Sequence, residues 1–412
     1  MRSLVRIFVL SLCLIGLVVG GLASGPAFAL SEEQNLVAEV WRIVNRAYLD
    51  ETFNHQNWWF TRQRVLKQPL ANRADTYKTI QQMLGSLNDP YTRLLPPEQY
   101  RSLQTSTSGE LTGVGLQITK DEKPGWLRVI TPIEGSPAEQ AGIQPKDLVL
   151  EIDGTDTTDL TLDEAAARMR GPQGSRVTLK LQHDDGSQTQ LVSLTRQVIS
   201  LNPVTATLQT TTSGKTVGYI RLTQFNGNAA ENLANAIRSL QESEAEGYIL
   251  DLRNNPGGLL QAGIEIARLW LPKGTIVFTV SRQGILDSFE AYGPALTNAP
   301  LVLLVNEGTA SASEILAGAL QDNGRAQLVG STTFGKGLIQ SLFDLSDGSG
   351  LAVTVAKYET PDHHDINRLG ITPDRVVEAR GLNRDTIATA ADPQYSAALE
   401  VLDQATVVAG VP

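Results

Sequence analysis

The sequence has little cysteine, little histidine and no cluster of basic residues. It contains one cysteine, Cys13, and four histidines among 412 residues. A single thiol excludes a disulfide within the chain, and because Cys13 lies in the first thirty residues, the rest has no cysteine nucleophile or thiolate metal ligand. The formal net charge is −10 with no basic run, so nothing indicates nucleic acid binding. No metal or other cofactor is expected.

Long apolar runs are absent except near the N-terminus. Two arginines precede an almost wholly apolar stretch at 7–19, and small residues lead to an A-x-A site that ends at Ala29. This order is typical of a secretory signal peptide, so we expect residues 1–29 to be removed and the protein to be exported. An uncleaved anchor is the alternative, although the run is short for a span of ~20 residues. Lipid attachment at Cys13 is disfavoured because Leu12 occupies the place of a small residue.

The remaining chain changes its hydrophobic period twice. Helical spacing over 31–50 and 76–87 predicts an N-terminal helical region, 30–110, with Ser31 and Gln34 spaced as a capping pair. We expect Trp58 and Trp59 to pack inside this region.

From residue 111 the period is two, with frequent turns and one helix over 162–170, which predicts a β-rich domain at 111–185. From about residue 218, strands alternate with helices over about 229–242, from after Gly257-Gly258 to Leu271, and over about 313–321. This predicts a layered α/β core at 186–380, completed by a C-terminal region at 381–412. The fold class is α/β (α+β multidomain).

Three loops follow predicted strands and hold unusual residues: RNNPGG at 253–258, NEGTASASE at 306–314 and TTFGKG at 332–337. In open α/β folds, ligands bind beyond the carboxyl ends of strands. Ser311 with Glu314 could be a plain capping box. Alternatively, Ser311 is a nucleophile at a strand-to-helix turn, where free amides stabilise an oxyanion.

A serine nucleophile needs a base, and the histidines are poorly placed. His55 and His183 lie away from the three loops, and His363-His364 has the character of a solvated turn. Lysine is the alternative, since burial lowers its reference pKa of ~10.4. Lys336 lies in an apolar, glycine-rich segment that begins with Phe334.

The same lysine completes a G-x-x-x-x-G-K pattern from Gly330, the opening of a phosphate-binding loop. Gly337 then stands where Ser or Thr should hold magnesium, so the pattern is broken. A base for Ser311 is the favoured interpretation of Lys336, and a nucleotide site is the alternative.

TASASEILAGALQDN and LVGSTTFGKGLIQ together resemble the active-site signature of carboxyl-terminal processing peptidases, the tail-specific serine proteases. DLRNNPGG resembles the family segment ahead of the serine, and GSPAEQAGIQPKDLVLEIDG resembles the PDZ domain of these enzymes. The resemblance runs from about residue 36 to 380. It implies a serine endopeptidase with Ser311 as nucleophile and Lys336, 25 positions later, as general base.

The resemblance also implies supporting residues. Gln340, placed one helical turn after Lys336, would orient the lysine, and the amides of Gly257 and Ala312 would form the oxyanion hole. Asp322 and Glu314 match acidic positions near the family's site. For these two residues a helix end and a capping box are equally good interpretations.

In the PDZ segment, four residues would hold the C-terminal carboxylate of a substrate: Gly113, Val114, Gly115 and Leu116. The glycines let consecutive amides face one point; a plain turn is the alternative. Lys146 replaces a glycine that is common before Asp147, which affects only the turn geometry. Arg170 matches an arginine that couples the PDZ domain to the core.

AYLDETFNHQNWW and LNDPYTRLLPPEQY resemble the N-terminal region of the cyanobacterial and chloroplast enzymes. The likeness implies a membrane-adjacent but soluble protein of the thylakoid lumen or periplasm, with no nucleotide or nucleic acid partner. Its substrates would be proteins with a free C-terminal tail, above all the photosystem II reaction-centre precursor. A general tail-specific protease is the alternative. A PDZ binding protein with an inactive core is less favoured, because Ser311 and Lys336 are both present.

Overall fold

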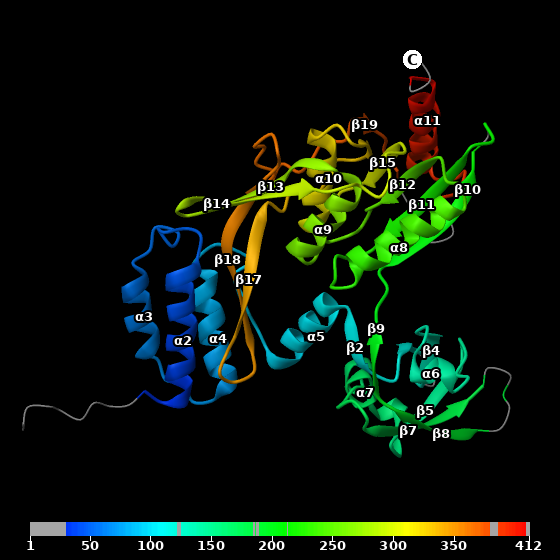
Figure 1. The fold of residues 1–412 in the computed structure, drawn as a ribbon. Coiled ribbons are helices and arrows are strands. Elements are labelled where there is room, and N and C mark those ends of the chain that lie inside the picture. The colour runs from blue at the N-terminus through cyan, green and yellow to red at the C-terminus, as the bar shows by residue number, and fades with distance from the viewer. Residues whose placement is uncertain are drawn as a thin grey trace, which may run out of the picture. The chain divides into compact units, whose positions relative to one another are not determined.

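The computed structural model describes residues 30–121, 125–183, 186, 189–211, 213–379 and 386–408. The predicted signal peptide at 1–29 lies outside these residues. The chain divides into two compact units (Figure 1). One is built from the chain up to Leu94 together with Leu342–Val353. The other is built from Leu95–Ser341 and the chain from Thr354 onward.

Three helices make up most of the first unit: α2 (Glu32–Ala47), α3 (Trp58–Leu66) and α4 (Arg73–Gly85). The predicted capping box at the start of α2 is confirmed, with Ser31 and Gln34 bonded reciprocally at 3.0 and 3.2 Å. The prediction for the tryptophans is half right. Trp58 is 3% exposed, whereas Trp59 is 54% exposed, because consecutive residues of a helix face different directions.

The β-rich domain has a five-stranded antiparallel path of β3 (Leu116–Lys120), β4 (Leu127–Pro132), β5 (Leu148–Ile152), β7 (Arg176–Gln182) and β8 (Gln190–Thr195). The short strand β6 (Thr155–Asp156) pairs with β5. Its helical segments are α6 (Pro137–Gln140), η1 (Thr157–Asp159) and α7 (Leu162–Met169). A ribbon of β2 (Glu110–Gly113) and β9 (Gln197–Ser200) adjoins the domain, and α5 (Pro97–Ser108) precedes it.

The α/β core is built on a six-stranded sheet with the order β10 (Val204–Thr210), β11 (Thr216–Leu222), β12 (Gly247–Asp251), β15 (Leu301–Val305), β16 (Gln327–Gly330) and β19 (Arg375–Val376). All neighbours are parallel except β10 and β11. Every residue of β12 and β15 is buried, as parallel strands covered on both faces require.

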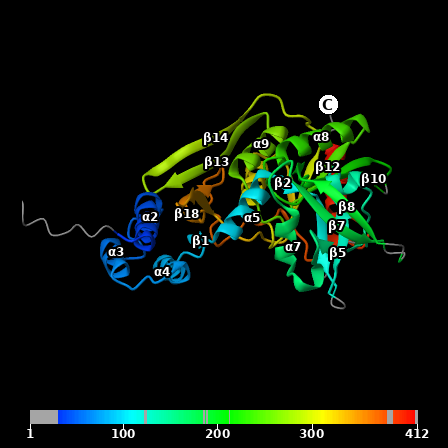
Figure 2. The same ribbon diagram turned by 90° about the horizontal axis from the view of Figure 1, so that it is seen from below.

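Helices cover both faces of this sheet (Figures 1 and 2). One face packs against α8 (Ala229–Glu242), α9 (Leu260–Trp270) and α10 (Ala312–Asp322). The other packs against α11 (Pro393–Val408) through Tyr395 and Ala398. The predicted layered α/β core is confirmed.

The sequence analysis did not predict the strands of a second sheet. In it β18 (Gly350–Glu359), β13 (Lys273–Ser281) and β14 (Gly284–Tyr292) pair in that order, and β17 (Leu338–Asp344) pairs with β18. A short strand, β1 (Arg93–Leu95), ends the N-terminal helical segment.

Candidate active site

Three loops meet at the carboxyl-terminal edge of the parallel sheet, as the sequence predicts. They follow β12, β15 and β16, which are neighbours in the sheet. Backbone bonds of 3.0 Å tie them together, from the Ala310 amide to the Asn255 carbonyl and from the Phe334 amide to the Thr309 carbonyl. The residues of all three loops are therefore held in one small site.

Ser311 stands at the start of α10 in a backbone conformation that few residues with side chains adopt. Its φ is 58° and its ψ is −118°, whereas a serine that only caps a helix is extended. Strain of this kind occurs at nucleophiles on sharp strand-to-helix turns. Ser313, by contrast, is fully buried and its hydroxyl donates to the Asn255 carbonyl at 3.0 Å. The geometry thus favours Ser311 over Ser313 as a nucleophile.

The buried carboxylate of Glu314 joins the serine turn to the lysine loop. Its Oε2 accepts the amides of Ser311 at 2.8 Å and Lys336 at 2.9 Å. Two such bonds to one oxygen hold the two amide nitrogens less than about 6 Å apart. Its Oε1 accepts the Gly335 amide at 2.7 Å and the Thr333 hydroxyl at 2.6 Å. Glu314 therefore fixes both segments that carry the predicted catalytic residues.

These contacts oppose a phosphate-binding loop at 330–336. The amides of Gly335 and Lys336, which would have to face a phosphate, already donate to a protein carboxylate. The segment after the loop is the strand β17, whereas a phosphate-binding loop opens a helix. Both observations agree with the missing hydroxyl at Gly337.

Tyr358 on β18 is a residue of this site that the sequence analysis missed. Its buried hydroxyl is bonded to the carbonyl oxygen of Lys336 and lies 3.2 Å from that of Ser311. Since a phenol has one proton, it donates to one carbonyl at a time. A tyrosine within an apolar strand predicts only packing, so the sequence carries no clear signal for this role.

The predicted apolar surroundings of Lys336 are found only in part. The lysine is partly buried, and the glycines on either side of it are buried and packed closely against residues 367–370. Phe334, however, is 57% exposed. The reason is local: Thr333 and Gly335 turn inward to Glu314, so the side chain between them turns outward.

The two predicted oxyanion donors differ in their bonding. The Ala312 amide, at the start of α10, has no acceptor among the residues that the structure describes. The Gly257 amide donates to Asn255 Oδ1 at 2.9 Å. Gly257 has φ 92°, and a Cβ there would lie 2.6 Å from the Ala310 carbonyl oxygen, so only glycine fits beside the serine turn.

Gln340 does not lie one helical turn after Lys336, so that part of the prediction is wrong. The segment is extended, because residues 338–344 pair with β18 as the strand β17. Gln340 Nε2 donates to the Thr354 hydroxyl at 3.4 Å. Its predicted contact with the lysine remains a prediction.

The acidic and histidine alternatives lie elsewhere. Asp322 ends α10, eleven residues or ~16 Å along the helix from Ser311, and accepts the Asp362 amide at 3.1 Å. This favours the helix-end interpretation. His363 is exposed, stacks on Phe278 and lies 3.1 Å from Glu359, which agrees with a solvated turn.

A groove of about 270 Å³ lies along the segment predicted to hold a carboxylate. Its lining includes Gly113, Val114, Gly115 and Leu116, and across from them Ala166, Met169 and Arg170 of the α7 segment. Gly115 has φ 80°, and neither its amide nor that of Val114 has an acceptor in the part of the chain described. Two open amides at a glycine turn are what a terminal carboxylate needs.

Two further predictions in this domain can be located. Lys146 adopts φ 76°, so the turn keeps the conformation that a glycine would favour. Arg170 is exposed at the end of α7. No hydrogen bond or ion pair of Arg170 is found among the described residues, and its coupling role remains a prediction.

A buried ion network behind the RNNPGG loop was also missed. Arg253 is bonded to Asp251 at 2.7 Å and to Asp392 at 2.8 Å, and all three side chains are buried. Burial alone would raise the pKa of Asp392, but the guanidinium bonds hold it below its usual value. The network anchors the loop to the segment that leads into α11.

Within the described ranges, no cluster of three or more histidine, cysteine, aspartate or glutamate residues has the arrangement of a metal site. None of the helices in those ranges has the length and apolarity that a membrane crossing requires.

Family models match both parts of the larger unit. The model for peptidase family S41 matches residues 216–377, and a PDZ domain model matches residues 128–183. Both matches agree with the predicted PDZ domain and peptidase core.

Three similar proteins are all named for the same activity, the processing of carboxyl termini. The chain is 60% identical over 383 residues to the carboxyl-terminal-processing protease of Synechocystis sp., covering 93% of this chain and 90% of that protein. It is 47% identical to carboxyl-terminal-processing peptidase 2, chloroplastic, of Arabidopsis thaliana, covering 85% of this chain and 70% of that protein. A solved photosystem II D1 C-terminal processing protease superimposes with a TM-score of 0.58 at 41% identity, covering 89% of this chain and all of that one.

Proposed function

The chain belongs to peptidase family S41 as a carboxyl-terminal-processing serine peptidase, and we propose that Ser311 and Lys336 carry out its chemistry. The observation that carries this proposal is the Glu314 carboxylate, which binds the amides of both residues. Lys336, as the neutral amine, takes the Ser311 proton while Oγ attacks the scissile carbonyl carbon. The amine that leaves is protonated by the same lysine, and water then hydrolyses the acyl-serine.

The oxyanion of each tetrahedral intermediate would lie against the amides of Ala312 and Gly257. The open amide of Ala312 supports the first role. The second requires Gly257 to release Asn255 Oδ1, a bond that a substrate oxyanion can replace because hydrogen bonds to charged acceptors are stronger. Gln340 would orient the lysine once a substrate is bound, and Asp322 would support the helix rather than the chemistry.

The PDZ groove would hold the C-terminal carboxylate of the substrate. The open amides of Val114 and Gly115 support this, and the extended tail would add beside β3 opposite α7. Arg170, at the rim of the groove, would report occupancy to the core. Tail binding contributes binding energy away from the scissile bond and positions the chain for cleavage.

The substrate proposed is the precursor of the photosystem II D1 protein, after the solved relative named for processing it. Relatives from a cyanobacterium and from chloroplasts agree with this assignment. The signal-peptide pattern at 1–29 supports export to the thylakoid lumen or periplasm, where this soluble enzyme would work next to the membrane. A general tail-specific protease is the second candidate, favoured by a groove that binds a carboxylate found at every C-terminus.

Mass spectrometry of tail peptides tests the function. The protein should cleave a peptide of the D1 precursor tail at one bond, and Ser311→Ala should abolish the cleavage while the fold is kept. Equal cleavage of unrelated tails would favour the general protease. Cleavage retained by Ser311→Ala would refute the assigned nucleophile.

A further inference from the structure

The surface of α3 in the N-terminal unit exposes two adjacent aromatic residues. Trp59 is 54% exposed and Phe60 is 68% exposed, although the neighbouring Trp58 is buried. Trp59 lies edge-on to Trp41 of α2, with ring centroids 5.9 Å apart. Phe60 follows Trp59 on the same helix, so α3 presents two large aromatic side chains to solvent, and exposed apolar surface of this kind is typical of an interaction site.

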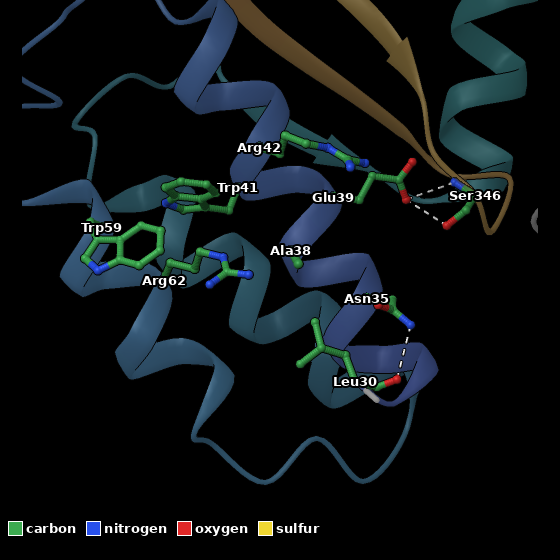
Figure 3. A pocket seen from close by; sticks show the side chains of 9 residues that line it. All are labelled: Leu30, Asn35, Ala38, Glu39, Trp41, Arg42, Trp59, Arg62 and Ser346. Carbon is green, nitrogen blue, oxygen red and sulfur yellow. Dashed lines mark hydrogen bonds between the residues drawn. The ribbon is translucent and has the colours of Figure 1, made fainter. Parts of the chain in front are cut away.

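An arginine side chain lies beside both tryptophan rings (Figure 3). The Arg62 guanidinium lies 5.4 Å from the ring centroids of both Trp41 and Trp59. These residues, with Arg42 and Leu30, line a pocket of about 560 Å³. The pocket's one carboxylate, on Glu39, is bonded to Ser346 at 2.7 Å.

The segment that contains α3 is opposite in charge to the whole chain. From Asn57 to Lys67 there are three basic residues and no acidic one, in a chain of net charge −10. No ion pair of Arg42, Arg62 or Arg64 is found in the described ranges. A positive surface with exposed tryptophan fits the headgroup region of an anionic bilayer, where indole rings and arginines both concentrate.

The first described residue, Leu30, lies at the same pocket. Leu30 lines the pocket, and only ten residues, 20–29, separate it from the end of the apolar stretch at 7–19. Even fully extended, that connection spans no more than about 40 Å. If the predicted signal at 1–29 enters a membrane during export, Leu30 and the pocket beside it would lie within that distance of the lipid.

We propose that the pocket surface of Trp41, Trp59, Arg42 and Arg62, together with the exposed Phe60 that follows Trp59 on α3, docks on anionic lipid headgroups. The aromatic rings enter the headgroup layer and the guanidinium groups pair with lipid phosphates. The docking holds the peptidase beside a membrane after the first 29 residues are gone. This inference does not depend on the peptidase chemistry, so its test can fail while the proposed function stands.

The chain from Leu30 onward retains every described residue and excludes binding through the apolar stretch. It should sediment with phosphatidylglycerol vesicles and not with phosphatidylcholine vesicles. Trp59→Ser with Phe60→Ser should weaken this binding at least tenfold. Arg62→Gln should weaken it roughly fivefold. Cleavage of a free peptide should be unchanged in both variants.

A matched control is available on β14. Ile285 and Leu286 are likewise consecutive and exposed. Unlike Trp59 and Phe60, they are aliphatic, and an acidic residue, Asp287, follows them. Ile285→Ser with Leu286→Ser should bind vesicles like the unchanged protein. A loss of the same size in this control would show a non-specific effect and overturn the proposal.

Brominated phosphatidylglycerol locates the contact directly. It should quench the tryptophan fluorescence of the protein, and Trp59→Phe should keep vesicle binding while losing most of the quenching. Unchanged quenching, or no vesicle binding by the unchanged protein, contradicts the proposal. If the protein instead sediments as a dimer that Trp59→Ser with Phe60→Ser dissociates, the surface joins two copies of this chain.

Discussion

Two turns of this chain carry sets of neighbouring backbone amides, and they differ in the acceptors that those amides meet. In the active site, the amides of Ser311, Gly335 and Lys336 all donate to Glu314, a carboxylate of the protein itself. In the PDZ groove, the amides of Val114 and Gly115 meet no acceptor in the described chain. The first turn is filled by an acceptor of the protein itself, and the second is open to a carboxylate from outside.

We interpret the first turn as one that positions the proposed catalytic residues and the second as one that would bind the end of a substrate. An internal carboxylate holds two distant segments in one geometry before any substrate arrives, which suits groups that must align for proton transfer. An open set of amides gains its acceptor only on binding, so it contributes affinity for a tail. We expect damage to the filled turn to lower kcat and damage to the open turn to raise KM.

The largest effect is expected at the lysine. Lys336→Arg should lower peptide cleavage by on the order of 10³-fold or more, nearly as much as Lys336→Ala, because arginine stays protonated and cannot accept the serine proton. In the unchanged enzyme, activity should rise with pH as the lysine loses its proton. Steady-state rates measured across pH check both points. An active arginine variant would show that positive charge suffices and that Lys336 is not the base.

Glu314→Gln tests the filled turn itself. The neutral amide presents one acceptor oxygen where four donors now converge, so kcat should fall by on the order of 10²-fold and stability by about 1–3 kcal/mol. Thermal unfolding and kcat measured together check this. Thr333→Ser, which keeps a hydroxyl for the carboxylate, is the mild control. Full activity in Glu314→Gln would mean that the carboxylate does not position the dyad.

Tyr358→Phe should have a smaller effect and lower kcat about tenfold with KM unchanged. The variant loses only one of the several hydrogen-bonding groups that connect the serine turn to the lysine loop. The pH dependence of kcat should shift as well, since the lysine loop changes its position. Tyr248→Phe is a matched control, because the buried hydroxyl of Tyr248 has no hydrogen-bond partner among the described residues. If Tyr358→Phe loses stability but keeps both kcat and its pH profile, the tyrosine is only structural.

The smallest effect is expected from the open turn. Amidation of a substrate tail removes the terminal charge, so cleavage should slow about five- to tenfold through KM. Ala166→Tyr on the groove side of α7 should erase the preference for the free acid, while Ala167→Tyr, at an exposed position, should retain it. If the unchanged enzyme cleaves the free-acid and the amidated tails at equal rates, the Gly113–Leu116 segment is only a plain turn and does not bind the carboxylate.

What the sequence could predict follows from how local each feature is. The helix at 229–242 and the strand at 301–305 have the predicted bounds, because their periodicity lies within one segment. The pairing of β18 with β13 joins segments about 80 residues apart, and no local pattern encodes it. The pairing of β17 with β18 is likewise not encoded in the local sequence, so Gln340 was wrongly assigned a helical position.

In the candidate active site too, local sequence patterns predicted some residues and missed those whose role depends on distant segments. Ser311 and Lys336 are identifiable from their motifs, but the role of Glu314 depends on a loop twenty residues later in the chain. Tyr358 acts through its hydroxyl, and an apolar strand pattern reports only the burial of its ring. Trp59 is exposed because of its angle on α3, and spacing alone does not distinguish it from Trp58.

The central claim is that Lys336 activates Ser311, and intact-protein mass spectrometry after reaction with a fluorophosphonate tests it directly. The account predicts one adduct, located on the peptide that contains Ser311, absent from Ser311→Ala and formed far more slowly in Lys336→Arg. An adduct on another residue, or labelling of Lys336→Arg at the unchanged rate, would contradict it.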